Sequence, residues 1–354
     1  MKIFFLDQSG KPGGAELCLI DIAKPYKDRC LVGLFAEGSF RNLLQQNHIP
    51  VQVLTTQAIE VRKESSLAQG LGSLGQLIPL IAKVVQQARE FDLIYANTQK
   101  ALVVGALASF FSRRPLVYHL HDIHSPEHFS KTNRSIAVTC ANRFASLVIA
   151  NSQASQAAFL AAGGRPDITK VVYNGFDTKN YQIQESDVRQ IRQQLGIDGQ
   201  FVVGHFSRLA PWKGQHILIE ALAKSPLDVT AILVGDALFG EQEYVQHLHQ
   251  QVTRLGLENR VKFLGFRSDI PLLMSACDLV AHTSTAAEPF GRVIVEGMLC
   301  GRPVVAAKAG GAIELVEHGV NGFLVTPAKP DELAQVITTC LQEPEKTANI
   351  AALK

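Results

Sequence analysis

Short apolar runs rich in β-branched residues alternate along the chain with stretches whose apolar residues recur every three or four positions. The first pattern is typical of buried strands and the second of helices that cover a sheet, so together they predict an α/β protein with parallel sheets. The predicted strands of a first sheet are Lys2–Leu6, Cys30–Phe35, Val51–Leu54, Leu93–Ala96, Leu116–Leu120, Leu147–Ala150 and Val171–Tyr173. The helices predicted between them are Ala15–Ala23, Leu74–Arg89 and Ser152–Ala162.

The alternation breaks at residues 177–199, a polar, glutamine-rich segment with one predicted helix, Ser186–Leu195. We place a linker there, between an N-terminal domain of residues 1–176 and a C-terminal domain of residues 200–354. Two doubly wound, Rossmann-like domains are expected to face each other across a cleft, with ligands at the carboxyl ends of their strands. The strands predicted for the second domain are Phe201–Phe206, Thr230–Val234, Val261–Leu264, Leu279–His282, Val304–Ala306 and Phe323–Val325.

Composition narrows the class of protein. With 354 residues, 47% hydrophobic and 19% charged, the chain has the composition of an ordinary globular protein large enough for two domains. Its longest nearly unbroken apolar run, Ala101–Phe111, is too short to cross a bilayer, and no secretion signal follows Met1. The six cysteines are far apart, so we expect reduced thiols that pack in the core. These features predict a cytoplasmic protein.

The net charge of +2 conceals an asymmetry between the two halves of the chain. Residues 1–175 hold 18 Lys and Arg against 12 Asp and Glu, a balance of +6, and the remainder holds 16 against 20, a balance of −4. A basic first half favours an anionic acceptor or peripheral contact with an anionic membrane, although scattered solvated charges explain it equally well. No arginine-rich stripe with interleaved aromatic residues points to a nucleic-acid partner.

A dinucleotide-binding fingerprint, G-x-G-x-x-G, occurs at residues 70–75. That motif binds a pyrophosphate only on a turn between a strand and a helix. The residues before it, 61–66, are mostly charged and polar, so they do not form a buried strand. We interpret the glycines as a loop that enters a helix, and a dehydrogenase is disfavoured.

The segment Glu288–Glu296 combines two carboxylates with the predicted start of a helix. Pro289 and Gly291 mark a turn, and the apolar spacing after it predicts a helix beginning near Gly291. A helix N-terminus offers unpaired N–H groups and a positive dipole end, which suits a diphosphate. The carboxylates of Glu288 and Glu296 could take sugar and ribose hydroxyls of one ligand. An exposed glutamate before an ordinary helix is the plainer alternative.

Two cations follow the first predicted strand of the second domain. Arg208 and Lys213 come directly after Phe201–Phe206, where the ligand crevice of such a sheet is expected. Two fixed cations near a diphosphate would stabilise the negative charge that builds on a leaving group. The alternative, solvated loop cations, is weakened by Pro211 and Gly214, which predict a shaped turn. Asp-x-Asp, a common metal–diphosphate motif, is absent from the sequence, so we expect no metal ion as cofactor.

The first domain offers fewer clear signals. Gly13 and Gly14 open the first predicted helix, so their N–H groups could bind a phosphate or an acceptor, while Glu16 could simply favour the helix N-terminus. His119 and His121 share one face of a predicted strand, and two more histidines follow in the loop, at His124 and His128. A metal site is conceivable there, but no carboxylate-rich cluster accompanies these histidines, so we expect none. Core packing is the expected role of His119.

Taken in order, these motifs make the chain similar to glycosyltransferase family 4, the retaining nucleotide-sugar transferases of GT-B fold. The resemblance covers nearly the whole chain, and its strength lies in the order and spacing of motifs that are weak one by one. The matching motifs are Gly13-Gly14-Ala15-Glu16, His121-Asp122, Asn174-Gly175-Phe176-Asp177, Arg208 with Lys213-Gly214, Val234-Gly235-Asp236, Val261-Lys262-Phe263-Leu264-Gly265, Glu288 with Glu296, and Gly310-Gly311.

The resemblance implies roles for particular residues. The expected catalytic residues are His121, Arg208, Lys213 and Glu288. The expected donor-binding residues are Gly14, Asn174, Arg208, Lys213, Gly235, Arg267, Glu288, Phe290, Gly291 and Glu296, and the expected acceptor-binding residues are Gly13, Gly14 and Glu16. By this resemblance Arg208 and Lys213 hold the diphosphate. Glu288 and the backbone at Phe290 and Gly291 hold the sugar, Glu296 holds the ribose, and His121 contacts the sugar near the reacting carbon.

The resemblance also implies a reaction. A sugar would pass with retention of configuration from a nucleotide diphosphate, uridine first and guanosine next, to a saccharide, lipid or small-molecule acceptor. The departing phosphate can take the acceptor proton itself, so no protein base is nominated. The alternatives are an epimerase or phosphorylase on the same fold and a non-catalytic nucleotide-sugar binding protein.

Family members usually add helices that return to the first domain. Here the sequence ends at Lys354, soon after the predicted helix Asp331–Leu341, so we expect either a truncated sequence or a chain without that brace.

Overall fold

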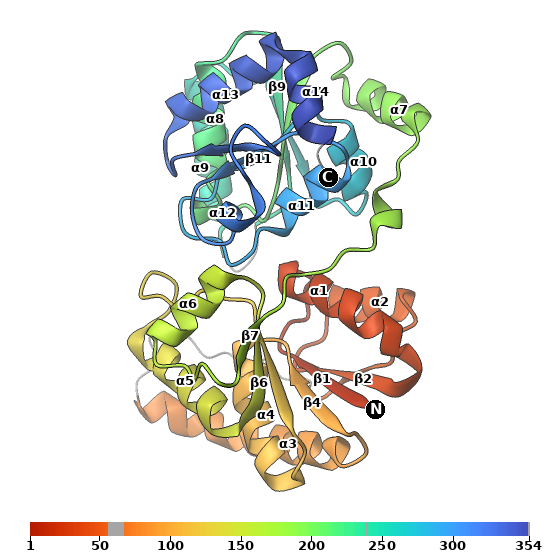
Figure 1. Cartoon of the computed structure of the whole chain (residues 1–354), viewed down its shortest axis with the longest axis vertical. Helices are drawn as coiled ribbons and strands as arrows, with labels where there is room; N and C mark the ends of the chain where they lie inside the picture. The colour runs from red at the N-terminus through yellow and green to blue at the C-terminus, as the bar shows by residue number, and fades with distance from the viewer. Residues whose placement is uncertain (56–66, 238–239, 353–354) are drawn as a thin grey trace. The chain divides into compact units, whose positions relative to one another are not determined.

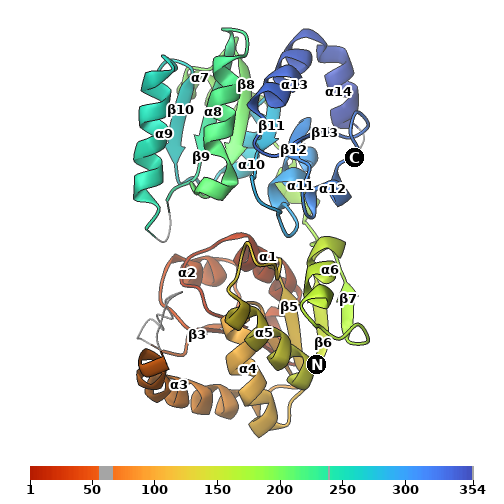
Figure 2. The same ribbon diagram turned by 90° about the vertical axis from the view of Figure 1, so that its left-hand side faces the viewer.

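The computed structural model describes residues 1–55, 67–237 and 240–352. The chain divides into two compact units, Met1–Phe176 and Asp177–Lys354. Each unit is a parallel sheet covered by helices, as Figures 1 and 2 show. The predicted pair of Rossmann-like α/β domains is therefore confirmed at the level of each unit.

The first unit contains a seven-stranded sheet in the order β3-β2-β1-β4-β5-β6-β7. Its strands are β1 (Ile3–Asp7), β2 (Cys30–Leu34), β3 (Val51–Val53), β4 (Leu93–Ala96), β5 (Leu116–Leu120), β6 (Ala145–Ala150) and β7 (Thr169–Val171). Its described helices are α1 (Gly14–Ala23), the 3₁₀ helix η1 (Lys24–Arg29), α2 (Ser39–Gln46), α3 (Leu67–Ala88), α4 (Gln99–Ser112), α5 (Lys131–Phe144) and α6 (Gln153–Ala161).

The alternation of side chains along β1 explains how this sheet is buried on both faces. Phe4 and Leu6 pack with residues of α3, α4 and α5 in one core. Ile3 and Phe5 point to the other face and pack with residues of α1 and α2. Since successive side chains of a strand point to opposite faces, a strand with helices on both sides is apolar throughout. This requirement is why the strands stand out in the sequence.

The second unit contains a six-stranded sheet in the order β10-β9-β8-β11-β12-β13. Its strands are β8 (Phe201–Phe206), β9 (Val229–Val234), β10 (Val261–Gly265), β11 (Leu279–His282), β12 (Val304–Ala307) and β13 (Phe323–Val325). Its described helices are η2 (Thr178–Tyr181), α7 (Glu185–Leu195), η3 (Pro211–Lys213), α8 (Gln215–Ala223), α9 (Gln242–Arg254), α10 (Ile270–Ser275), α11 (Arg292–Leu299), α12 (Ala312–Leu315), α13 (Pro330–Gln342) and α14 (Pro344–Ala352).

Two sequence interpretations need correction. The G-x-G-x-x-G stretch at residues 70–75 lies inside α3 and is not a loop. Packing of α3 along α4 offsets the cost of glycine in a helix, about 1 kcal/mol per residue. The segment 177–199, interpreted as a linker, belongs to the second unit. It contributes Ile191 and Ile197 to that unit's core, because α7 packs against α10.

Two further expectations concern the core and the membrane. All six cysteines are free thiols, and five of them are buried, as expected for small core residues. Within the described residues, no helix combines the length and the apolar character needed to cross a membrane.

Candidate functional site

In the second unit, β8 and β11 are neighbours at the point where the strand order reverses. The chain winds one way from β8 to β9 and β10, and the other way from β11 to β12 and β13. Loops that follow two such strands diverge, and the space between them is where doubly wound sheets bind ligands. The predicted cations Arg208 and Lys213 follow β8, and the predicted carboxylate Glu288 follows β11. The topology therefore brings together residues that the sequence separates.

Lys213 and Glu288 form a bidentate ion pair at this point. The Lys213 Nζ donates to both carboxylate oxygens of Glu288 at 2.8 Å, and the two side chains are only 17% and 12% exposed. Ser284 Oγ donates to Glu288 Oε2 at 2.9 Å, and His282 Nε2 lies 3.2 Å from the same atom. The ammonium group also lies 4.1 Å from the centroid of the Trp212 ring. The carboxylate is thus held by several polar partners.

These partners decide the charge of Glu288. Burial by itself raises the pKa of a carboxyl group, but the charge of Lys213 and the hydrogen bonds from His282 and Lys213 outweigh it. The pKa of Glu288 is consequently held well below its usual range. Glu288 is an anion at neutral pH and accepts hydrogen bonds, so it is unsuited to proton transfer near pH 7. Burial disfavours the charged form of the neighbouring His205 as well, and for an imidazole this lowers the pKa, here to about 3.

Glycines allow the two loops to approach closely. Gly214 has φ +74°, and a Cβ there would lie 2.0 Å from the carbonyl oxygen of Thr283. Gly310 has φ +59°, and a Cβ there would lie 2.2 Å from the carbonyl oxygen of Glu288. Gly311 N donates to that same oxygen at 2.7 Å. The glycines of both sequence motifs therefore position the Lys213 and Glu288 loops through backbone contact.

Three further predicted donor residues, Arg208, Arg267 and Gly235, lie in other loops of the second unit. Arg208 Nε is 3.2 Å from Glu241 Oε2 in a partly exposed ion pair. Arg267 donates to both oxygens of Asp269 at 2.8 and 2.5 Å. Gly235 follows β9 with φ +139°, where a Cβ would lie 2.0 Å from the Ser207 carbonyl oxygen.

The start of α11 completes this side. Gly291 is its N-cap residue, with φ +92°, and Phe290 before it is buried. Glu296, one turn into the helix, pairs with Arg292 at 3.3 Å. The predicted helix beginning near Gly291 is confirmed, and Glu296 lies beyond its first turn. Ile294 N donates to the carbonyl oxygen of Gly291 at 3.0 Å in this first turn, and the positive end of the helix dipole there favours an anion.

The first unit has an equivalent reversal of strand order, between β1 and β4. Asp7 ends β1 and Asn97 follows β4. Asn97 Nδ2 donates to Asp7 Oδ2 at 2.7 Å and to the carbonyl oxygen of Ala15 at 3.1 Å. Asn97 Oδ1 therefore faces His121 Nε2, 3.0 Å away. Because that oxygen can only accept, this geometry assigns the hydrogen of His121 to Nε2.

Acidic groups near this reversal are buried without a cationic partner among the contacts described. Glu16 Oε2 accepts from Gly13 N at 2.9 Å and caps α1. Burial, reinforced by the negative charge of Asp7, raises the pKa of Glu16 to about 8. Burial also raises the pKa of Asp7, although hydrogen bonds from Asn97 and Ser9 oppose it. Asn174, a predicted donor residue, accepts from Cys18 Sγ at 3.3 Å and thus lies against α1.

The histidines of the sequence motif are not gathered as a set of four. The rings of His119 and His121 are 3.8 Å apart, whereas His124 packs against Phe129 and Phe159. His119 is buried, with Nδ1 at 2.8 Å from the Tyr95 hydroxyl. The ligand atoms of Cys18, His119 and His121 all lie within 4.8 Å of one another, which is a spacing a metal ion could bridge.

Several residues of the two sites escaped the sequence analysis. Asp7 and Asn97 stand directly at the ends of predicted strands, and His282 and Ser284 stand at the end of β11. A rule that selects polar residues at every strand end would have found them. Without the strand order it would equally have selected polar residues at strands far from the reversal.

Comparison with known families agrees with this geometry. The model of Glycosyltransferase Family 4 matches residues 12–180, and that of Glycosyl transferases group 1 matches residues 187–352. Anabaena Alr3699/HepE, solved in complex with UDP-glucose, is 72% identical and superposes with a TM-score of 0.93. That match covers 99% of this chain and 93% of the Anabaena chain. This chain belongs to the family 4 glycosyltransferases.

Less similar relatives match over part of their length. Spore coat protein SA of Bacillus subtilis (strain 168) is 30% identical over 234 residues, covering 62% of this chain and 61% of its own. D-inositol 3-phosphate glycosyltransferase of Mycobacterium marinum is 30% identical over 276 residues, covering 74% of this chain and 58% of its own. The chain thus spans about three fifths of the length of these two relatives. The Anabaena protein has also been solved with UDP and with UDP and glucose.

Proposed function

We propose that this chain is a retaining glycosyltransferase that uses UDP-glucose and transfers the glucosyl group to a hydroxyl of a saccharide, lipid or small-molecule acceptor. The observation that carries the proposal is the buried pair of Lys213 and Glu288 at the strand reversal of the second unit. The choice of donor is supported by the UDP-glucose bound to the Anabaena protein, which is 72% identical.

The proposed roles follow from charge and position. Arg208 and Lys213 bind the diphosphate, together with the N–H groups at the start of α11. Glu288, an anion with its pKa held low, accepts hydrogen bonds from sugar hydroxyls. Glu296 accepts from the ribose. In the first unit, His121 is oriented by Asn97 and contacts the donor sugar, and the turn at Gly13 and Gly14 binds the acceptor.

In the proposed step, the bond between the anomeric carbon and the diphosphate oxygen breaks, and its electron pair leaves with the UDP. The acceptor oxygen forms the new bond on the same face of the sugar, and its proton passes to the departing phosphate. The negative charge on the diphosphate rises during the step, so cations placed there lower the barrier more than they strengthen ground-state binding. No protein base is required.

A donor panel followed by product analysis tests the proposal. UDP-glucose is expected to raise the melting temperature more than GDP-glucose or ADP-glucose does, because ligands that bind the folded state stabilise it. NMR of the product formed on an acceptor panel is expected to show the anomeric configuration of the donor. An inverted product rejects the mechanism. Interconversion of the nucleotide sugar without an acceptor indicates an epimerase, and a stabilising donor that never turns over indicates a binding protein.

We further propose that transfer is independent of metal ions, because Arg208 and Lys213 supply the positive charge and the sequence lacks Asp-x-Asp. EDTA is expected to leave turnover unchanged. Loss of activity with EDTA that magnesium or manganese restores would contradict this account. Loss that only zinc restores would direct attention to Cys18, His119 and His121.

A further inference from the structure

Two adjacent helices of the first unit, α3 and α4, expose large apolar side chains. Ile78 on α3 is 66% exposed, and Phe110 and Phe111 near the end of α4 are 66% and 59% exposed. Exposed apolar residues are ordinary when scattered, but these lie on helices that pack side by side. They therefore form one continuous apolar surface.

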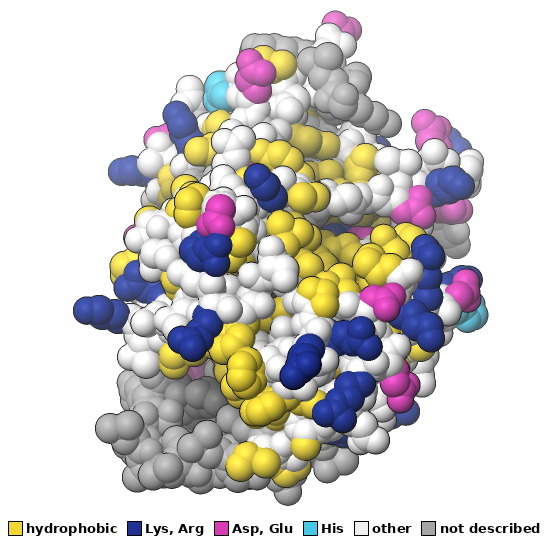
Figure 3. Space-filling model, turned by 60° about the horizontal axis from the view of Figure 1, so that its bottom comes forward, with side chains coloured by type: hydrophobic (Ala, Val, Ile, Leu, Met, Phe, Trp, Pro, Cys, Tyr) yellow, Lys and Arg dark blue, Asp and Glu magenta, His cyan; other side chains and the backbone are white. Residues whose placement is uncertain are grey.

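The spacing of the apolar positions places them on one face of each helix. On α3 the apolar residues recur at intervals of three, one and three positions, and on α4 they recur at intervals of three and one. This is the period of an apolar stripe along a helix. The residues are Ile78, Ile81, Ala82 and Val85 on α3, and Leu107, Phe110 and Phe111 on α4. Between the stripes runs a groove of about 600 Å³. Its lining residues are Ile78, Ile81, Ala82, Val85, Gln86, Arg89, Leu107 and Phe111. Figure 3 shows hydrophobic side chains on this side of the molecule with dark blue Lys and Arg side chains around them.

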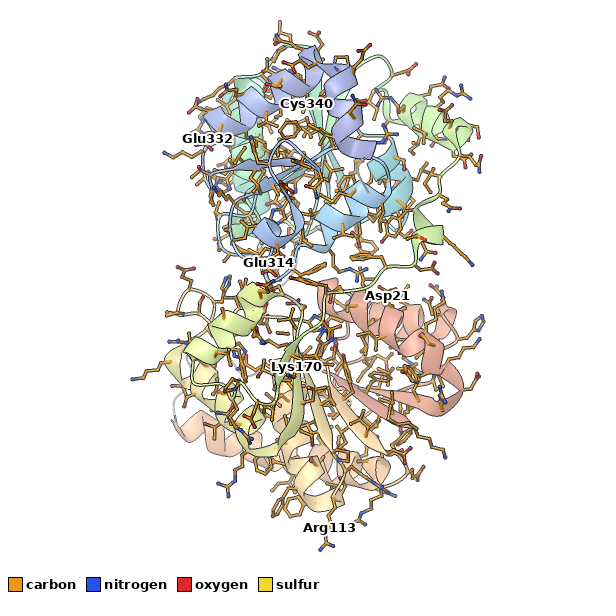
Figure 4. All side chains as sticks on the ribbon, in the orientation of Figure 1. Asp21, Arg113, Lys170, Glu314, Glu332 and Cys340 are labelled. Carbon is orange, nitrogen blue, oxygen red and sulfur yellow. The ribbon has the colours of Figure 1, made fainter. Side chains whose placement is uncertain are left out.

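Arginines surround the ends of these helices. Arg89 lines the groove, and Arg113, exposed just after α4, points away from the unit in Figure 4. Arg114 donates to the carbonyl oxygen of Arg89 at 2.8 Å. Arg143 lies at the end of α5, where the ring of the next residue, Phe144, is 6.3 Å from that of Phe110.

The charge of this rim is positive. The four arginines at positions 89, 113, 114 and 143 stand against two acidic residues in the same turns, Glu90 and Asp92, which gives 4 − 2 = +2. Asp92 also accepts from the backbone N–H of Lys2 at 2.8 Å. The exposed apolar side chains and the arginines around them are together typical of a surface that inserts into the interface of an anionic bilayer. Aromatic rings reach the acyl boundary there, and arginines pair with lipid phosphates.

We propose that this apolar groove with its arginine rim is a docking surface for anionic lipid bilayers. Phe110 and Phe111 enter the interface, and Arg89 and Arg113 contact the phosphates of anionic headgroups. The rim contributes +2 of the +6 balance of residues 1–175, so the proposal assigns part of that excess to a particular surface. It does not depend on the donor or the reaction, since none of these residues belongs to either strand reversal.

Sedimentation with vesicles tests the proposal on the full chain. Wild-type protein is expected to bind vesicles that contain phosphatidylglycerol, to bind phosphatidylcholine vesicles weakly, and to dissociate as salt is raised. Replacing both aromatic residues, Phe110→Ser with Phe111→Ser, is expected to weaken binding by about tenfold or more, since two inserted rings are lost. Arg89→Gln with Arg113→Asn is expected to weaken binding by about fivefold per charge at low salt. Asn is chosen at position 113 because φ there is +58°.

Matched control variants lie in the second unit. Leu227→Ser removes an apolar side chain that is 83% exposed, and Arg254→Gln removes an exposed arginine of α9. Both are expected to bind vesicles like the wild type. Every variant is expected to keep its melting temperature and its stabilisation by UDP-glucose, which separates loss of docking from misfolding.

Three results would overturn the proposal. Wild-type protein that ignores anionic vesicles at low salt has no such surface. Equal losses in the control variants would show that the measured binding is unspecific. Concentration-dependent self-association that is abolished by Phe110→Ser with Phe111→Ser, without vesicle binding, would identify the groove as an interface between copies of the chain.

Discussion

The two units place polar side chains at the same topological point but give them opposite electrostatics. In the second unit, Lys213 neutralises Glu288 and holds its pKa well below the usual range. In the first unit, burial raises the pKa values of Glu16 and Asp7. A doubly wound sheet therefore determines where side chains converge, while the partner of each acid determines its charge.

The difference matches the chemistry proposed for each unit. A diphosphate needs permanent cations and an anion that orients hydroxyls without titrating, which the second unit supplies. The first unit supplies side-chain hydrogen-bonding groups, Asn97 and His121, near acids whose pKa values burial raises. Three sets of variants test this contrast.

The largest effect is expected in the second unit. Lys213→Ala and Arg208→Ala are each expected to lower kcat by about 10² or more, with a smaller change in donor affinity, because both stabilise charge that develops on the leaving group. Lys213→Ala also leaves Glu288 buried without its ion-pair partner, so stability should fall by about 3 kcal/mol. The partly exposed Arg208 should cost far less stability. Steady-state kinetics and urea unfolding measure the two effects.

Glu288→Gln belongs to the same test. The amide keeps the size but loses the charge, so turnover is expected to fall by a similar factor, and the residual rate should not recover as pH rises. Lys224→Ala is the control, since it breaks an exposed pair with Asp331 and should leave turnover unchanged. A fully active Glu288→Gln variant would remove this residue from the site. Equal losses of affinity and kcat/KM in the cation variants would assign the cations to ground-state binding only.

A smaller effect is expected at Asn97 in the first unit. Asn97→Ala removes the acceptor that orients His121 Nε2. We expect kcat to fall by about tenfold, the range seen when a group that orients a functional histidine is lost. Asn97→Asp keeps an oxygen that can accept a hydrogen bond from His121. At low pH the new carboxyl group is protonated and therefore uncharged, like the amide that it replaces. Under those conditions Asn97→Asp should retain more activity than Asn97→Ala. Identical pH profiles for both variants would show that Asn97 does not act through His121.

The smallest effect concerns stability and pH. The pKa of Glu16 is raised in the folded state to about 8 from 4.5, so its contribution to stability is fully present below pH 4.5 and is lost as pH rises towards 8. Glu16→Gln cannot ionise and still caps α1. Its stability relative to the wild type should therefore improve by about 1 kcal/mol or more between pH 4.5 and 8. Parallel melting curves across this window would contradict the raised pKa.

Much of the fold could be predicted from the sequence because its information is local. Strands buried on both faces must be apolar, so β4, β5, β8, β11 and β13 were predicted with their bounds. In the first unit the helices α2, α4 and α5 were missed. For α4 and α5 the reason is that neither has a sharp division between apolar and polar faces. Gly214 and Gly310 were predicted as motif members. In the tertiary structure Gly214 lets the backbone of Thr283 come close to it, and Gly310 does the same for the backbone of Glu288.

The local pattern of residues specifies which side chains stand at the ends of strands, and hence which ones can reach a ligand. Which of these side chains meet depends on the order of the strands in the folded sheets. Lys213 and Glu288 are 75 positions apart, and Asp7 and Asn97 are 90 apart, so each contact depends on which strands are neighbours. The charge states of these acidic groups also depend on the tertiary structure. Desolvation and Coulomb interaction depend on distance and burial in space, and no local pattern of residues specifies either of them.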